Sequence, residues 1–426
     1  ENIQKNIKKW EPIKAEINVD KDALMWAVNG HDDRSVAFAA RLMELGVEVR
    51  IIDKNALLSE QSLPRGSVVI IGMDNPNYQD LSSVISSVAS GLDLSVLSIS
   101  SGFGAEELPD WGGRHFRLLE RPKIALMGHQ DFSSYDVGVS WWSLDHHLGI
   151  RHSMVNGSSL NYGDLRRYNT IIMPSGYQNL SNSEMSSLKE WIRQGGTLIA
   201  HNASSRSLSY ENGIGSVRQV SGTFDKSEEY NMDLQREFGA LNIEIDMEET
   251  NKNRVNYDVE YPWEGSSNKY SKAQLEKRDE WQSLFMPSGA FVAGRIDDEH
   301  WLTFGTIDTL PVLYSNLPVL MTGSNSEAAV RIGEIVPSDD ETYRSINWSD
   351  MPPNTDLNVR MSGLVWPEAS QRIANSAYLT RERIGRGQVI LFAGEPNFRG
   401  AALGTNRLWL NAVVYGSGLG LSLIHI

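Results

Sequence analysis

Cysteine is absent from this chain of 426 residues. Its absence excludes disulfide bonds, thiolate zinc sites and a cysteine nucleophile. Long apolar runs are missing as well, because no window approaches the roughly 18 apolar residues that span a membrane as a helix. We therefore expect no membrane-spanning segment. The missing cysteine leaves both a reducing cytosol and a disulfide-free bacterial exterior open.

Positive charge is also scarce: 39 Lys and Arg stand against 54 Asp and Glu, which gives a net charge of −15. Proteins that bind nucleic acids usually present a basic surface to the phosphates. The balance argues against a nucleic-acid partner, and we interpret it as a solvated acidic surface. Forty per cent apolar residues and 12 tryptophans indicate a globular protein. The length predicts at least two domains, because it exceeds that of one hydrophobic core.

Two blocks of alternating strands and helices are predicted after a charged linker at residues 1–20. The first block, residues 21–118, is expected to be a small α/β domain. The second, residues 122–418, begins with a strand–helix–strand–strand–helix–strand order that is typical of a flavodoxin-like, three-layer parallel sheet. The predicted fold class is therefore α/β. We expect residues 421–426 to be a non-native tail, because they resemble a translated sequencing adapter.

The second block departs from a simple alternation towards its end. Residues 206–289 are strongly polar, which predicts a long excursion away from the sheet. Apolar runs then predict added short strands at residues 290–296, 300–304, 312–314 and 329–335. A Gly-Arg-Gly turn at residues 385–387 predicts a final hairpin over residues 379–393.

Residues 195–205 form a corner that can carry chemistry. A buried strand at residues 197–200 ends there in small polar residues, at the edge of the sheet where α/β enzymes often place a nucleophile. His201 is the candidate base, Ser204 and Ser205 are the candidate nucleophiles, and Asn202 is a candidate binding residue. Arg206 follows where a small residue is usual, and the Gly-x-Ser-x-Gly pattern is absent. We expect the corner not to catalyse, and a serine hydrolase is the alternative.

A second polar cluster follows the predicted strand at residues 388–393. Glu395, Asn397 and Arg399 would lie at the same carboxyl edge of the sheet. Arg399 and Arg407 can hold a carboxylate through paired hydrogen bonds. The alternative is that Arg399 only ties down its loop by bonding to backbone carbonyls.

Metal ligands are not arranged convincingly in the sequence. His146 and His147 are adjacent, so on a helix they point about 100° apart. The acidic run at residues 297–300 lies between two predicted strands, and we favour a solvated turn there. No His-x-x-Glu pair of the zinc hydrolases occurs. We expect no metal site in this chain.

The tryptophans offer one further alternative, a carbohydrate- or cell-wall-binding module. Indole rings exposed on one face can stack on sugar rings, although buried packing is the ordinary role of tryptophan. The residues considered for such a face are Trp141, Trp142, Trp263, Trp281, Trp301 and Trp366.

Several runs of this sequence resemble one family of bacterial enzymes. They are residues 121–128 (RPKIALMG), 141–145 (WWSLD) with 148–149, 168–176 (YNTIIMPSG), 300–305 (HWLTFG), 362–368 (SGLVWPE), 387–400 (GQVILFAGEPNFRG) and 404–408 (GTNRL). Together they look like the C-terminal region of large bacterial zinc carboxypeptidases of the carboxypeptidase A class. A class I glutamine amidotransferase-like domain follows the peptidase domain in that family. The likeness covers residues 20–418, and residues 387–400 are its most specific part.

This resemblance implies an accessory role in a parent protein that removes C-terminal amino acids from peptides with zinc. The family's zinc ligands lie in an N-terminal peptidase domain that we do not find in this sequence, so we expect no cofactor here. A working amidotransferase needs a cysteine, which this chain lacks. The resemblance therefore implies a pseudoenzyme region of a secreted or periplasmic hydrolase. Its partners would be its own peptidase domain and, through it, a peptide substrate.

Overall fold

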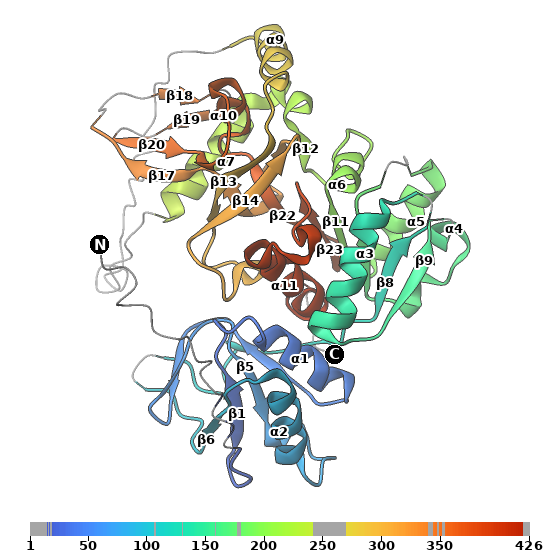
Figure 1. The fold of residues 1–426 in the computed structure, drawn as a ribbon, viewed down its shortest axis with the longest axis vertical. Helices are drawn as coiled ribbons and strands as arrows, with labels where there is room; N and C mark the ends of the chain where they lie inside the picture. The colour runs from blue at the N-terminus through green and yellow to red at the C-terminus, as the bar shows by residue number, and fades with distance from the viewer. Residues whose placement is uncertain are drawn as a thin grey trace, which may run out of the picture. The chain divides into compact units, whose positions relative to one another are not determined.

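The structure is a computed structural model that describes residues 15, 17, 19–105, 108–129, 131–157, 159–176, 180–241, 270–339, 344–346, 349–351 and 354–420. The chain divides into two compact units, Glu1–Arg121 with Leu148–Ile150, and Pro122–His147 with Arg151–Ile426 (Figure 1). Most of the predicted linker, residues 242–269 of the predicted excursion and the predicted tail at 421–426 lie outside the described residues.

The first unit contains a five-stranded sheet in the order β6-β1-β5-β2-β7, and every pair of neighbours is antiparallel. Its central strands β1 and β5 are entirely buried, which fits their continuous apolar sequences. The bounds of its elements are β1 Met25–Val28, α1 Ser35–Glu44, β2 Arg50–Ile52, β3 Ala56–Leu58, β4 Gln61–Leu63, β5 Val68–Ile71, α2 Leu81–Leu92, β6 Leu97–Ile99 and β7 Phe116–Leu118.

The second unit is built on five parallel strands in the order β9-β8-β10-β11-β23. Counted along the chain this is the order 2-1-3-4-5 of flavodoxin-like folds, with the reversal of strand order between β8 and β10. The strands are β8 Ile124–Gly128, β9 His152–Asn156, β10 Thr170–Met173, β11 Thr197–His201 and β23 Gly387–Phe392. The predicted flavodoxin-like sheet is confirmed.

Helices cover both faces of these parallel strands. The chain crosses the sheet in one direction from β8 to β9 and in the other from β9 to β10 and β11, so right-handed crossovers place α3 and α5 on opposite faces. Helix α11 contacts β10 and β11. Both α11 and α3 contact the short turn η8, Phe398–Gly400. The helices are α3 Ser134–Trp142, α4 Ser159–Tyr162, α5 Asn182–Arg193, α6 Ala203–Leu208 and α11 Leu403–Leu419.

The sequence of α5 shows why a helix forms there. Ser181 caps its first turn and exchanges hydrogen bonds with Glu184 in a capping box. Leu188, Trp191 and Ile192 lie on its buried face. Gly195, with a positive φ of 124°, follows the helix and allows the sharp return into β11.

Antiparallel strands extend the sheet beyond β23. Their order outward from β23 is β22, β16, β13 and β14. Strand β21 pairs with β13, and β15 pairs with β22. Figure 1 shows these antiparallel strands in orange and red, whereas β8, β9 and β11 are teal to green and the parallel strand β23 is red. The strands are β13 Ser288–Ile296, β14 Thr309–Ser315, β15 Leu320–Met321, β16 Ser326–Ile332, β21 Arg360–Ser362 and β22 Ala377–Ile384. The predicted hairpin over residues 379–393 is confirmed as β22–β23.

The remaining elements lie in and around the predicted excursion or form small sheets. They are β12 Arg218–Gln219, α7 Ser227–Leu241, α9 Lys272–Ser283, α10 Pro367–Ile373, and the pairs β17 Glu334–Pro337 with β20 Thr355–Asn358 and β18 Arg344–Ile346 with β19 Ser349–Met351. The strand predicted at 300–304 is wrong. It is the short turn η7, Trp301–Thr303, because the His300 side chain caps the Leu302 N–H. Across the described ranges, no helix is long and apolar enough to cross a membrane.

Candidate functional site

The turn between β11 and α6 has the backbone of a nucleophile elbow. Asn202 lies there with φ 53° and ψ −119°, a strained conformation between a buried strand and a helix. Enzymes of the α/β class expose a nucleophile on such a turn. The side chain at this position is a carboxamide, which is not a nucleophile. The corner therefore combines the backbone shape of such a turn with a carboxamide side chain.

The serine–histidine pair of the alternative hydrolase has no hydrogen bond between its members among the described residues. The Ser204 hydroxyl donates to the carbonyl oxygen of Pro174, 2.5 Å away. The Ser205 hydroxyl and both ring nitrogens of His201 are buried, and they have no hydrogen-bond partner among the described residues. Burial lowers the pKa of His201 to about 4, against the opposing effect of the Asp136 charge. The ring is thus neutral at pH 7.

A carboxyl pair lies at the same edge of the sheet. Asp136 comes from the first turn of α3, and Glu395 comes from the loop after β23. Burial, a side-chain hydrogen bond with Asp136 and the Asp136 charge raise the pKa of Glu395 to about 8, although Arg399 opposes this. Glu395 is therefore largely protonated at neutral pH. Glu395 was predicted to lie at this edge, but Asp136 was not.

Helix α3 faces the loop after β23 with polar side chains. Asn397 donates from Nδ2 to the Ser143 hydroxyl at 3.2 Å, and Asn406 Nδ2 lies 3.1 Å from His147 Nδ1. The Oδ1 atoms of both asparagines and the buried Ser140 hydroxyl have no partner in the described part of the chain. We call this contact the polar seam, formed by Asp136, Ser140, Ser143, His147, Glu395, Asn397 and Asn406.

A distortion of the helix accompanies the polar seam. Helix α3 continues into a π-helical turn, Ser143–Leu148, which is a feature often found at functional sites. His146 stacks on Trp142 with ring centroids 4.9 Å apart, and His147 meets the same ring edge-on at 4.3 Å. Burial and the neighbouring His146 lower the pKa of His147. Both imidazoles are thus packed on Trp142, and they do not converge on one point.

The two predicted arginines have different surroundings. Arg407 is buried in α11, where its Nε donates to Asn411 Oδ1 at 3.1 Å. Arg399 is exposed, and its guanidinium lies 5.0 Å from the centre of the Phe398 ring. The structure thus buries one of the two candidate guanidinium groups and exposes the other.

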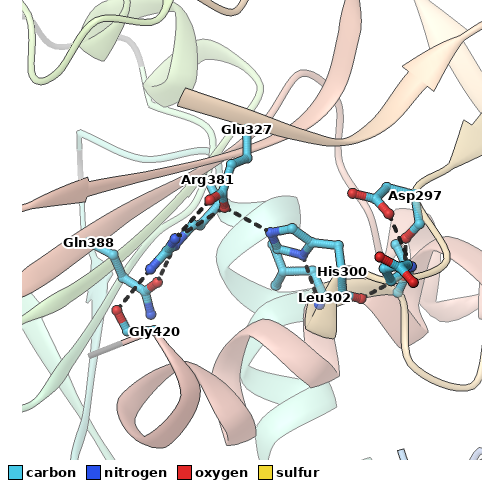
Figure 2. A network of polar contacts seen from close by, with 9 residues as sticks. Asp297, His300, Leu302, Glu327, Arg381, Gln388 and Gly420 are labelled. Carbon is cyan, nitrogen blue, oxygen red and sulfur yellow. Dashed lines mark hydrogen bonds and ion pairs between the residues drawn. The ribbon is translucent and has the colours of Figure 1, made fainter. Parts of the chain in front are cut away.

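The acidic run at residues 297–300 belongs to a structural network (Figure 2). His300 Nδ1 accepts from the Leu302 N–H at 3.1 Å, and His300 Nε2 lies 3.2 Å from a carboxylate oxygen of Glu327. Arg381 donates to the same carboxylate and to the carbonyl oxygen of Gly420 at the end of α11. Within the ranges that the structure describes, no three His, Asp or Glu side chains are placed to hold a metal ion.

The tryptophans divide between exposed and packed positions. Trp281 and Trp366 are 57% and 50% exposed, and Phe285 contacts both rings, with centroids 5.0 and 6.3 Å away. Trp141 is partly exposed on α3, whereas Trp301 stacks on His300. Trp263 lies outside the described residues. The structure therefore brings two of the six candidate tryptophans together on the surface.

No family model and no curated protein matches the sequence. Some solved structures show a weak likeness in fold. A putative ThuA-like protein from Bacteroides uniformis is 13% identical with a TM-score of 0.32, over 68% of this chain and 89% of that one. One from Parabacteroides merdae is 11% identical with a TM-score of 0.35, over 72% and 93%. A β-galactosidase from Bacillus circulans sp. alkalophilus is 12% identical with a TM-score of 0.33, over 70% of this chain and 32% of that one. These values carry no argument about activity.

Proposed function

We propose that this chain is a non-catalytic accessory region of a zinc carboxypeptidase-like protein. The parent would remove C-terminal amino acids from peptides outside the cytoplasm, and zinc would belong to its separate peptidase domain. That peptidase domain would be the partner of this region, and a peptide substrate would be met through it.

The proposed non-catalytic role is supported by the identity of the residue at the elbow, Asn202. A hydrolase of this architecture needs a hydroxyl or thiol at the position of Asn202 and a base within hydrogen-bond reach of it. The nearby Ser204 hydroxyl is committed to Pro174, and His201 bonds to neither serine. These contacts support a corner that does not catalyse hydrolysis.

Turnover assays test the silent role. The purified chain should hydrolyse neither p-nitrophenyl esters, nor glutamine, nor peptides with a free C-terminus, with or without added zinc. His201→Ala and Ser205→Ala are the matched variants. Ester hydrolysis that both variants abolish would establish the serine hydrolase instead, and zinc-dependent release of C-terminal residues would show a self-contained peptidase.

The accessory role has its own test, which is binding to the peptidase domain. A carboxypeptidase A-class domain encoded upstream of this region should bind it in a size-exclusion or calorimetric titration. Its peptidase activity or its thermal stability should change when the region is added. A complete lack of binding and of any such change would reject the accessory role while leaving the silent corner intact.

A second candidate function is carbohydrate binding on the surface formed by Trp281, Phe285 and Trp366. The specific observation is that two half-exposed indoles flank one phenyl ring. Trp281→Ala and Trp366→Ala should then weaken retention on insoluble polysaccharides or peptidoglycan, whereas Trp141→Ala should not. Equal retention of all three variants would remove this candidate.

A further inference from the structure

A cavity in the second unit lies between α7, β12 and the loop at residues 323–325. It has a volume of about 840 Å³, within the usual range of small-molecule sites of roughly 300–1,000 Å³. A second cavity of about 280 Å³ shares Gln219 and Ser221 with it. The two cavities therefore adjoin each other at Gln219 and Ser221, and we call the adjoining pair the cleft. Two adjoining cavities suit a chain-like ligand better than a compact one.

The floor of the cleft is an aromatic ring among polar groups. The Tyr230 side chain is buried there, and the backbone of Gly323 passes close to its ring and to the Asp233 carboxylate. Burial raises the pKa of the Tyr230 phenol, against the opposing effect of Arg218. The phenol is thus a neutral donor beside a guanidinium. Tyr210, which is 54% exposed, adds a second ring at the rim.

The charges that line the larger cavity cancel. Its carboxylates are Glu211, Asp225, Glu229 and Asp233. Its cations are Arg218, Lys226, Arg236 and Lys272. The smaller cavity adds Arg206 and Arg372, and Arg372 is paired with Asp279. In the larger cavity a strongly anionic or cationic chain would meet as many repulsive as attractive groups, so its lining favours a ligand without net charge.

The uncharged side chains of the lining restrict the chemical class of the ligand further. They carry mainly hydroxyl and amide groups, as in Ser216, Gln219, Ser221 and Asn325. Met232 is the one aliphatic side chain at the larger cavity among the described residues. A peptide would find little apolar surface for its side chains. A sugar chain offers hydroxyl groups to charged and amide partners, and carbon–hydrogen faces to tyrosine rings.

We propose that the cleft formed by Tyr210, Arg218, Gln219, Glu229, Tyr230 and Asp233 is a binding site for an uncharged oligosaccharide. The site stands whether or not the elbow is silent, because it uses none of the elbow's residues. It is also separate from the surface of Trp281 and Trp366, which are not among its lining residues.

Calorimetric titration of the whole chain tests this site. The probes are cellohexaose, xylohexaose, maltohexaose and chitohexaose, with an uncharged Gly-Ser hexapeptide amide, acetylated at its N-terminus, as the peptide probe. At least one of the four oligosaccharides should bind. Tyr210→Ala and Glu229→Gln should each weaken that binding about tenfold or more, which corresponds to about 1.4 kcal/mol. Tyr135→Ala is the control, because Tyr135 is 85% exposed on α3 and does not line the cleft.

Three results would overturn the site. They are an absence of binding by all four oligosaccharides, a loss of binding in Trp281→Ala or Trp366→Ala with the cleft variants unaffected, and binding of the hexapeptide in place of the sugars. Each result is a measurement of binding and not of turnover. It therefore does not test whether the elbow catalyses, which the turnover assays decide. The circular dichroism spectrum of each variant shows whether it is still folded, so loss of a binding contact can be distinguished from unfolding.

Discussion

Asn202 has a strained backbone at the turn between β11 and α6, with φ 53° and ψ −119°. Its backbone conformation is costly for a residue with a Cβ atom and free of that cost for glycine. Asn202→Gly should therefore keep or raise the free energy of unfolding, by up to about 1 kcal/mol. Asn202→Val should lower it by about 1–3 kcal/mol, because a branched side chain tolerates this turn least. Urea denaturation measures both, and a valine variant as stable as the glycine variant would contradict the strain.

Glu395 should make stability fall as the solution becomes alkaline. Its pKa is raised to about 8 in the folded chain, so the folded state holds a proton that the unfolded state releases at about pH 4.5. Stability is therefore lost as the pH rises through this interval. Glu395→Gln should flatten the fall between pH 5 and 8.

The partner of Glu395 supplies the control for this effect. Asp136→Asn removes the hydrogen-bonding and charged neighbour, so it should reduce the same slope in thermal unfolding followed at several pH values. An unchanged slope in both variants would show that Glu395 is not protonated at neutral pH in the folded chain.

Single side chains differed in how well the sequence located them. Glu395, Asn397 and His201 follow or end buried strands, so their place at the carboxyl edge could be read from the strand pattern. Asp136 and Ser140 belong to a helix, and only the packing of α3 against the loop after β23 brings them to that edge. No local pattern in the sequence indicates the contact between α3 and this loop. The spacing of Asp136 and Ser140, one helical turn apart on a buried face, is the one signal that could have indicated it.

Several elements meet at Glu327, which joins the start of β16 to Arg381 of β22 and His300 before η7 (Figure 2). The hydrogen bond with His300 and the charge of Arg381 lower the pKa of Glu327 to about 2, against the opposing effect of burial. This stabilisation is present above about pH 4.5 and is lost as the pH falls towards 2.

Glu327→Gln should therefore lower the melting temperature at pH 7 and reduce its fall between pH 5 and 3. The expected loss is small, because the carboxylate is half exposed and screened by solvent. Glu276→Gln, on the exposed side of α9, is the control that should change neither. A Glu327→Gln curve parallel to the parent curve would contradict the role of this network.

Elements with strong local signals were predicted with close bounds, whereas some antiparallel strands were located with shifted bounds. Strands β8, β10, β11 and β23 are short and buried on both faces, so their continuous apolar runs reveal them. The antiparallel strands β13 and β16 were expected at residues 290–296 and 329–335 but begin earlier, because irregular burial and register shifts blur their periodicity. Residues 300–304 looked like a strand because Trp301, Leu302 and Phe304 are apolar, but the His300 cap turns them into η7.

Taken as a whole, the chain is two structures with separate sheets. The first unit has its own core, in which Met25, Leu58, Leu63, Val69 and Phe116 are almost completely buried. All of its sheet pairings are antiparallel and formed within residues 25–118. Its sheet therefore does not depend on strands of the second unit.

A fragment of residues 19–121 should therefore fold by itself. About 100 residues with one core are enough for a stable domain, with a free energy of unfolding of about 5–15 kcal/mol. Urea should unfold the fragment in one cooperative step, followed by the fluorescence of Trp26, which is buried in β1. Val69→Asp is the matched variant, because it places a charge in the fully buried centre of β5, and it should abolish that step. A gradual, non-cooperative loss of structure in the parent fragment would mean that this core needs the rest of the chain to close.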